Sequence, residues 1–145
     1  ALCKIKAGKQ KKLFLGNLNA KRDWGHARDY CLAMWKILQQ KKPDDYVIAT
    51  GKQHSIRQFI NFVAKKLNMK IIWKGTGLNE VGYDVLNKKK IILVDKNYIR
   101  PLDVNTLLGN AAKARRELKW KPQINIHTLI DEMITEEMNI LSNDQ

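Results

Sequence analysis

The sequence predicts a mixed α/β fold in which helices cover a few short strands. Short apolar runs bounded by Gly, Asn or Pro alternate along the chain with segments whose apolar residues recur at helical spacing. The composition, 44% hydrophobic and 28% charged over 145 residues, is that of a globular protein. Because a chain of this length normally forms one domain, we expect a single domain over residues 1–145.

The first part of the chain predicts two strands and two helices. Residues 12–16 predict a short strand, and residues 46–50 predict a buried one. Between them, residues 26–40 predict a helix with one apolar face, which we expect to lie in the core. That face consists of Ala27, Tyr30, Cys31, Met34, Trp35 and Leu38. Ser55 and Gln58 form a capping box, which predicts the start of the next helix.

The remainder of the chain predicts two further strands and two further helices. The strands cover residues 70–73 and 91–94, and we expect a loop over residues 74–90 between them. The helices cover residues 110–118 and 125–141.

The charge of the chain is strongly positive. Lys and Arg number 27 against 14 Asp and Glu, a net charge of +13, and 21 of the cations are lysines. Because the acidic residues are spread through the whole chain, this pattern favours a solvated lysine surface over a nucleic-acid footprint. A basic module that binds nucleic acid or another polyanion on a borrowed fold remains the alternative hypothesis.

Several classes of protein find no support in the sequence. No apolar run approaches the roughly 20 residues of a membrane span, and the first residues do not resemble a signal peptide. Cys3 and Cys31 are too few for a disulfide framework, so we expect a reducing, cytoplasmic location. His26 and His54 are interpreted as local hydrogen-bonding groups, and we expect no metal site. Glycine-rich phosphate loops and nucleophile elbows are both missing, so no catalytic apparatus is visible.

Two arginines stand in turns that would hold them rigidly. Arg22 lies between a Gly-Asn turn and a helix, and Arg100 precedes Pro101. An arginine fixed in this way is suited to bidentate recognition of a phosphate or carboxylate. On local pattern alone, surface ion pairs of Arg22 with Asp23 and of Arg100 with Asp103 are the favoured interpretation.

Seven stretches of the chain, taken in order, resemble a known family. They cover residues 16–30, 44–51, 54–59, 79–82, 98–101, 107–109 and 118–122. Together they resemble the GDP-mannose 4,6-dehydratases of the extended short-chain dehydrogenase/reductase superfamily, over nearly the whole chain. The resemblance implies the carboxy-terminal, substrate-binding portion of a Rossmann-type fold.

The resemblance also implies what this sequence lacks. The family's dinucleotide-binding glycine motif, its catalytic Thr and Glu, and its Tyr-x-x-x-Lys pair lie upstream of this region, and nothing here matches them. We therefore expect no catalytic residue in this chain, an absent amino-terminal dinucleotide-binding half, and no activity from the chain alone. Residues 46–50 would join the parallel sheet of that half.

The resemblance assigns roles to particular residues. Arg22 and Arg100 match the family arginines that hold the nucleotide diphosphate, and this role displaces the ion-pair interpretation. Asp103 stands where the family usually has Glu, an acid expected to contact the ribose, and its shorter side chain reaches less far. Asn17 and Lys21 lie in the matching turn and are assigned as residues that line the site.

The implied function is that of a lyase in nucleotide-sugar biosynthesis. The full enzyme would convert GDP-mannose to GDP-4-keto-6-deoxymannose, on the route to GDP-fucose, with NADP as cofactor. The implied partners are GDP-mannose, an amino-terminal Rossmann half or partner chain, and further copies in a homo-oligomer, with neither membrane nor nucleic acid. A third interpretation is a truncated or split product that is not stable alone, with apolar faces exposed.

Overall fold

The computed structural model describes residues 1–100, 102 and 104–143, and these form two compact units. Unit 1 comprises residues 1–20, 55–105 and 130–145, and unit 2 comprises residues 21–54 and 106–129. Pro101 and Asp103 lie outside the described residues. Within the described part, no helix combines the length and apolar character needed to cross a membrane.

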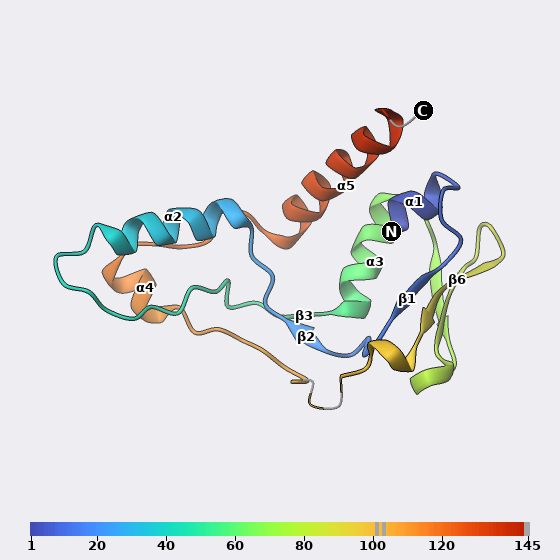
Figure 1. Cartoon of the computed structure of the whole chain (residues 1–145), viewed down its shortest axis with the longest axis horizontal. Coiled ribbons are helices and arrows are strands. Elements are labelled where there is room, and N and C mark those ends of the chain that lie inside the picture. Colours follow the sequence, from blue (N-terminus) through green and yellow to red (C-terminus); the bar gives the residue numbers. More distant parts are fainter. Residues whose placement is uncertain (101, 103, 144–145) are drawn as a thin grey trace. The chain divides into compact units, whose positions relative to one another are not determined.

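The chain alternates short helices and strands (Figure 1). The helices are α1 (Leu2–Lys6), α2 (Ala27–Leu38), α3 (Ile56–Lys66), α4 (Ala112–Glu117) and α5 (Ile126–Asn143), with 3₁₀ turns η1 (Gly77–Asn79) and η2 (Lys96–Tyr98). The strands are β1 (Leu13–Leu15), β2 (Lys21–Arg22), β3 (His54–Ser55), β4 (Ile71–Lys74), β5 (Val81–Asp84) and β6 (Lys89–Val94). The mixed α/β class predicted from the sequence is confirmed.

Unit 1 is built on a four-stranded sheet in the order β1-β6-β5-β4. β1 runs parallel to β6, with Leu13 opposite Ile92, whereas β5 is antiparallel to both of its neighbours. A methyl group at Gly82 would lie 3.0 Å from the Ile92 side chain and 3.2 Å from the Trp73 ring. Glycine at this position therefore lets neighbouring side chains pack over β5.

The core of unit 1 is the face of α3 packed with the sheet. Ile60 and Ala64 of α3 are buried in one cluster with Ile91 and Ile92 of β6. The predicted capping box is confirmed, because Ser55 Oγ accepts from Gln58 N and Gln58 Oε1 accepts from Ser55 N. Amphipathic spacing and a strong cap thus give α3 both its start and its buried face.

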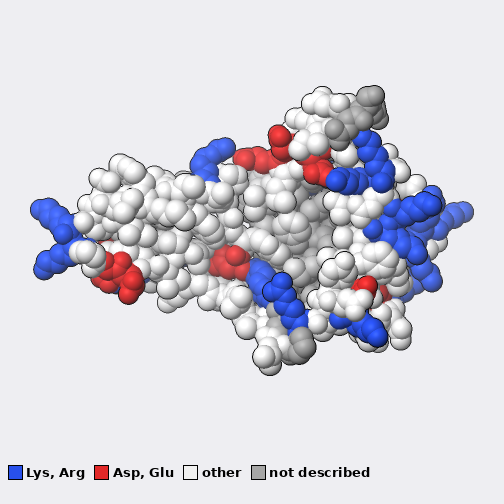
Figure 2. Space-filling model, in the orientation of Figure 1, with Lys and Arg blue, Asp and Glu red and all other residues white. Residues whose placement is uncertain are grey.

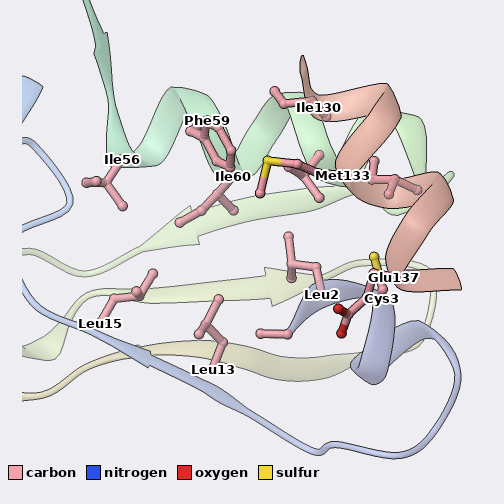
Figure 3. A pocket seen from close by; sticks show the side chains of 13 residues that line it. Leu2, Cys3, Leu13, Leu15, Ile56, Phe59, Ile60, Ile130, Met133 and Glu137 are labelled. Carbon is pink, nitrogen blue, oxygen red and sulfur yellow. The ribbon is translucent and has the colours of Figure 1, made fainter. Parts of the chain in front are cut away.

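A cavity of about 280 Å³ remains in unit 1 among α1, β1, α3 and the unit 1 part of α5 (Figure 3). Its lining is almost wholly aliphatic and aromatic, and burial raises the pKa of the Cys3 thiol beside it. The acid in the lining, Glu137, has a carboxylate oxygen 3.9 Å from the Lys4 ammonium group. This cavity offers little to orient a polar substrate.

Unit 2 is held together by contacts between α2 and the segment that follows α4. Trp120 is 1% exposed, and its Nε1 donates to the Asp29 carbonyl at 2.9 Å. The Asp29 carboxylate is also buried, and its Oδ2 accepts from Gln123 N at 3.0 Å and Ile124 N at 2.9 Å. A buried acid is acceptable here because backbone donors replace the water it loses.

The prediction of a strand at residues 46–50 is wrong for this chain. The segment carries no strand pairing, and it packs instead against residues around α4. Lys113 Nζ lies 4.9 Å from the centre of the Tyr46 ring and 2.6 Å from Asp44 Oδ2, and a methyl group at Gly109 would lie 2.1 Å from Ala49 Cβ. An apolar run forms a strand only where the backbone of another strand is available for hydrogen bonding.

Two other predictions differ from the structure. Residues 74–90, predicted to be a loop, contain η1 and β5, because pairing with β4 and β6 overrides the low strand propensity of Gly and Asp. The helix α1 was not predicted, because five residues are too few to display a helical period. The other predicted helices and strands are confirmed to within a few residues.

The apolar face of α2 points to solvent within the described structure. Met34, Trp35 and Leu38 are 62%, 58% and 80% exposed, and Cys31 is exposed as well. The expectation that this face lies in the core is therefore wrong for this chain. The opposite side of the helix, with Ala33, packs against Trp120. Helical spacing identifies an apolar stripe but does not determine what covers it.

Candidate functional site

Unit 1 brings the turn after β1 against the segment that leads to Arg100. A methyl group at Gly16 would lie 2.2 Å from the Tyr98 carbonyl oxygen, so only glycine allows this approach. Asn17 Oδ1 accepts from Asn19 N at 3.0 Å, and Asn17 Nδ2 donates to Asn105 Oδ1 at 3.3 Å. Asn17 thus tightens its own turn and connects it to Asn105, five residues after Arg100 in the sequence. Arg100 is exposed and lies two residues after the end of η2.

A charged cluster that sequence analysis missed supports the same turn. Arg57 of α3 forms an ion pair with Glu80, and its Nη2 donates to Asn19 Oδ1 at 2.9 Å. The Arg57 guanidinium also lies 4.8 Å from the centre of the Trp73 ring. The available signal was that Asn19, Arg57 and Glu80 each lie in one of the family-like stretches, although far apart in sequence.

In unit 2, the segment that carries Arg22 is anchored at Asp23. Asp23 Oδ1 accepts from Thr50 N at 3.0 Å and from Thr50 Oγ1, and Oδ2 accepts from Gly51 N at 2.8 Å. Lys21 forms a bridge with Thr106, and Arg22 Nη1 donates to the Lys21 carbonyl at 2.8 Å. These bonds fix the backbone from which the Arg22 side chain extends.

A polar pocket of about 240 Å³ in unit 2 lies next to this segment in the chain. Trp24, Lys52, His54 and His127 line it, and no acidic side chain is among its described lining residues. Burial lowers the pKa of His54, as do the charges of His127 and Lys52, whereas the charge of Asp23 raises it. The described lining thus brings together a lysine and two imidazoles without an acid, a combination that residue spacing did not reveal.

The residues predicted from the sequence fall into two groups. Asn17 lies with the segment of Arg100 in unit 1, and Lys21 lies with Arg22 in unit 2. Asp103 is outside the described residues. His26 is an N-cap, as expected, since its Nδ1 accepts from Arg28 N at 3.0 Å. Among the described residues, no three His, Cys, Asp or Glu side chains are grouped so that they could hold a metal ion.

Solved structures identify the class of fold. The RMD protein of Pseudomonas aeruginosa, solved with NADPH, matches with a TM-score of 0.72 at 18% identity, over 95% of this chain and 40% of that one. The dTDP-glucose 4,6-dehydratase of Bacillus anthracis, solved with NAD, matches at 0.67 and 18% identity, over 92% and 36%. The fold is that of part of an extended short-chain dehydrogenase/reductase, as predicted.

Sequence comparison then identifies the family. The family model for GDP-mannose 4,6 dehydratase matches residues 1–133. GDP-mannose 4,6 dehydratase 2 of Caenorhabditis elegans is 44% identical over 144 residues, 99% of this chain and 37% of that protein. The Homo sapiens GDP-mannose 4,6 dehydratase is 41% identical over 97% of this chain and 38% of its own length. The chain belongs to the GDP-mannose 4,6 dehydratase family, and it spans about two fifths of the length of these relatives.

Proposed function

We propose that this chain supplies the diphosphate-binding side chains of a GDP-mannose 4,6-dehydratase. Arg22 and Arg100 hold the two phosphates, Asp103 contacts the ribose, and Asn17 and Lys21 line the site. The observation that carries the proposal is membership of the family across residues 1–133, which include all five residues.

The local geometry supports these assignments. Each arginine extends from a backbone segment that other parts of its own unit hold in place: the Gly16–Tyr98 approach for Arg100, and the Asp23 hydrogen bonds for Arg22. Guanidinium groups carried on fixed backbone bind phosphate with less loss of conformational freedom. Clamping the diphosphate positions the sugar for reaction, which is the contribution expected from binding residues.

The proposed reaction oxidises C4 of the mannose, loses water across C5 and C6, and returns hydride to C6. A nicotinamide cofactor supplies the hydride chemistry. The described residues do not fit a dinucleotide pyrophosphate, because α2, α3 and α5 begin at the side-chain caps His26, Ser55 and Asn125 and not at glycine-rich turns. This chain therefore takes no part in hydride transfer. The remaining length of the family protein binds NADP and makes the oligomer contacts.

The proposal is tested by thermal melting of the chain with and without millimolar GDP-mannose. A ligand at about 100 times its Kd stabilises a folded protein by ~2.7 kcal/mol, so we expect a clear rise in Tm. Arg22→Ala and Arg100→Ala should each remove most of that rise. Arg116→Ala is the matched control, because this exposed arginine of α4 pairs with its neighbour Glu117 and should leave the rise unchanged.

Nucleotide competition tests the substrate class. GDP should reproduce the shift, whereas ADP at the same concentration should give less of it. An equal shift in the Arg22→Ala and Arg100→Ala variants would contradict the assignment of the two arginines. We also expect no turnover of GDP-mannose by this chain with NADP, and product formation would refute that expectation.

A further inference from the structure

A lysine-lined hollow in unit 1 has no role in the function proposed above. It has a volume of about 660 Å³ and lies between the α1–β1 connection and the strands β5 and β6. Five of its lining residues are lysines, namely Lys6, Lys11, Lys12, Lys89 and Lys90. Figure 2 shows Lys and Arg side chains gathered at this end of unit 1.

The five lysines differ in their partners from three lysines elsewhere in the chain. Elsewhere, Lys66 pairs with Asp131 at 2.8 Å, Lys113 pairs with Asp44 at 2.6 Å, and Lys9 donates to the Leu141 carbonyl at 2.8 Å. Among the described residues, no ion pair involves any of the five lysines of the hollow. Their mutual repulsion is therefore not relieved by an ion pair with any described acid.

One acid, Asp84, also lines the hollow. Asp84 is 1% exposed, and its carboxylate faces its own turn. Its Oδ1 accepts from Leu86 N at 3.1 Å, and its Oδ2 accepts from Asn87 Nδ2 at 2.6 Å. These neutral donors leave the charge of Asp84 in place, so the lining carries five lysines against one acid and is positive overall.

We propose that this hollow binds a compact polyphosphate group. Its volume is within the range of small-molecule pockets, and its ammonium groups are point charges that bind phosphate without a fixed geometry. Its floor is aliphatic (Ile5, Met69 and Ile91), and no aromatic residue lines it. A site without an aromatic platform favours small phosphate anions over the stacked bases of single-stranded nucleic acid.

Calorimetric titration of the 145-residue chain with inorganic tripolyphosphate tests this site. Lys89→Gln with Lys90→Gln should weaken binding at least about tenfold, because each lost contact between opposite charges near a surface reduces affinity severalfold. Lys41→Gln with Lys42→Gln is the matched control: it removes an adjacent, exposed pair of lysines from unit 2 and should change Kd less than about twofold. Lys11→Gln with Lys12→Gln gives a second variant of the site outside any strand.

Comparison of ligands identifies the source of the phosphate. ATP should bind about as well as tripolyphosphate if the phosphates alone are recognised, and orthophosphate should bind far more weakly. The proposal is overturned if wild-type chain does not bind tripolyphosphate, if the control pair weakens binding as much as the site pairs, or if an oligonucleotide binds more tightly than tripolyphosphate. Because none of these lysines belongs to the proposed GDP-sugar site, the two proposals fail independently.

Discussion

Unit 1 and unit 2 bury their apolar residues to different extents. Unit 1 has a four-stranded sheet whose buried cluster draws on α1, α3, β6 and the end of α5. The buried cluster of unit 2 consists of Ala33, Ala111, Ala114, Leu118 and Trp120. Because three of these five residues are alanines, the cluster gives unit 2 close helix packing but little apolar volume.

Unit 2, which has the smaller buried cluster, also leaves large apolar side chains exposed. Unit 2 turns Met34, Trp35 and Leu38 of α2 to solvent, and its apolar segment at residues 46–50 pairs with no strand in this chain. Several large apolar side chains exposed on one helix are typical of an interface. We propose that the family's remaining length covers these side chains and that segment, as the sequence led us to expect for residues 46–50.

The largest effect is expected at Trp120. Trp120→Ala removes the largest side chain of the buried cluster of unit 2 and its hydrogen bond to Asp29, so it should destabilise unit 2 by about 3–5 kcal/mol. Hydrogen exchange followed by NMR should then show amides of α2 and α4 losing protection while those of β5 and β6 keep theirs. Simultaneous loss of protection in both units would contradict the view that each has its own core.

A smaller effect is expected at Gly16 in unit 1. Gly16→Ala places a methyl group against the Tyr98 carbonyl and should cost about 2–3 kcal/mol through overpacking, measured by denaturant unfolding. Gly8→Ala is the control, because position 8 has open space and only a left-handed φ of 75°, a strain of about 1–2 kcal/mol. Equal costs would mean that the Gly16 turn and Tyr98 can separate freely.

The smallest effect on stability is expected on the exposed face of α2. Trp35→Gln should change the free energy of unfolding by no more than about 0.5 kcal/mol, because Trp35 is already largely in water. Ile37→Gln, on the packed side of the same helix, should be clearly destabilising. If Trp35→Gln is as destabilising as Ile37→Gln, the two faces are equally packed.

Much of the fold could be predicted because its signals are local. The capping box of Ser55 and Gln58 and the helical spacing after it are contained within one short window, and α3 followed from them. β5 could not be predicted in this way, since Gly82 is acceptable there only because Ile92 and Trp73 pack over it. The exposed face of α2 was misassigned for a related reason, because a stripe carries no information on its partner.

The candidate site was less accessible to sequence reasoning. Only the resemblance to the family distinguished Arg22 and Arg100 from ordinary surface arginines, and their roles stay predictions. The contacts that support their segments, such as Asp23 with Thr50 and Arg57 with Glu80, join residues more than 20 positions apart. No pattern within a single window reveals such pairs.

The hydrogen bond between Trp120 and Asp29 determines how early unit 2 can fold during synthesis. It joins residues 91 positions apart, and residues 55–105 between them belong to unit 1. At a synthesis rate of roughly 5–20 residues per second, a ribosome would expose α2 roughly 5–20 s before Trp120 emerges. During that interval both faces of α2 are uncovered, so the nascent chain should be a substrate for chaperones well before unit 2 can close.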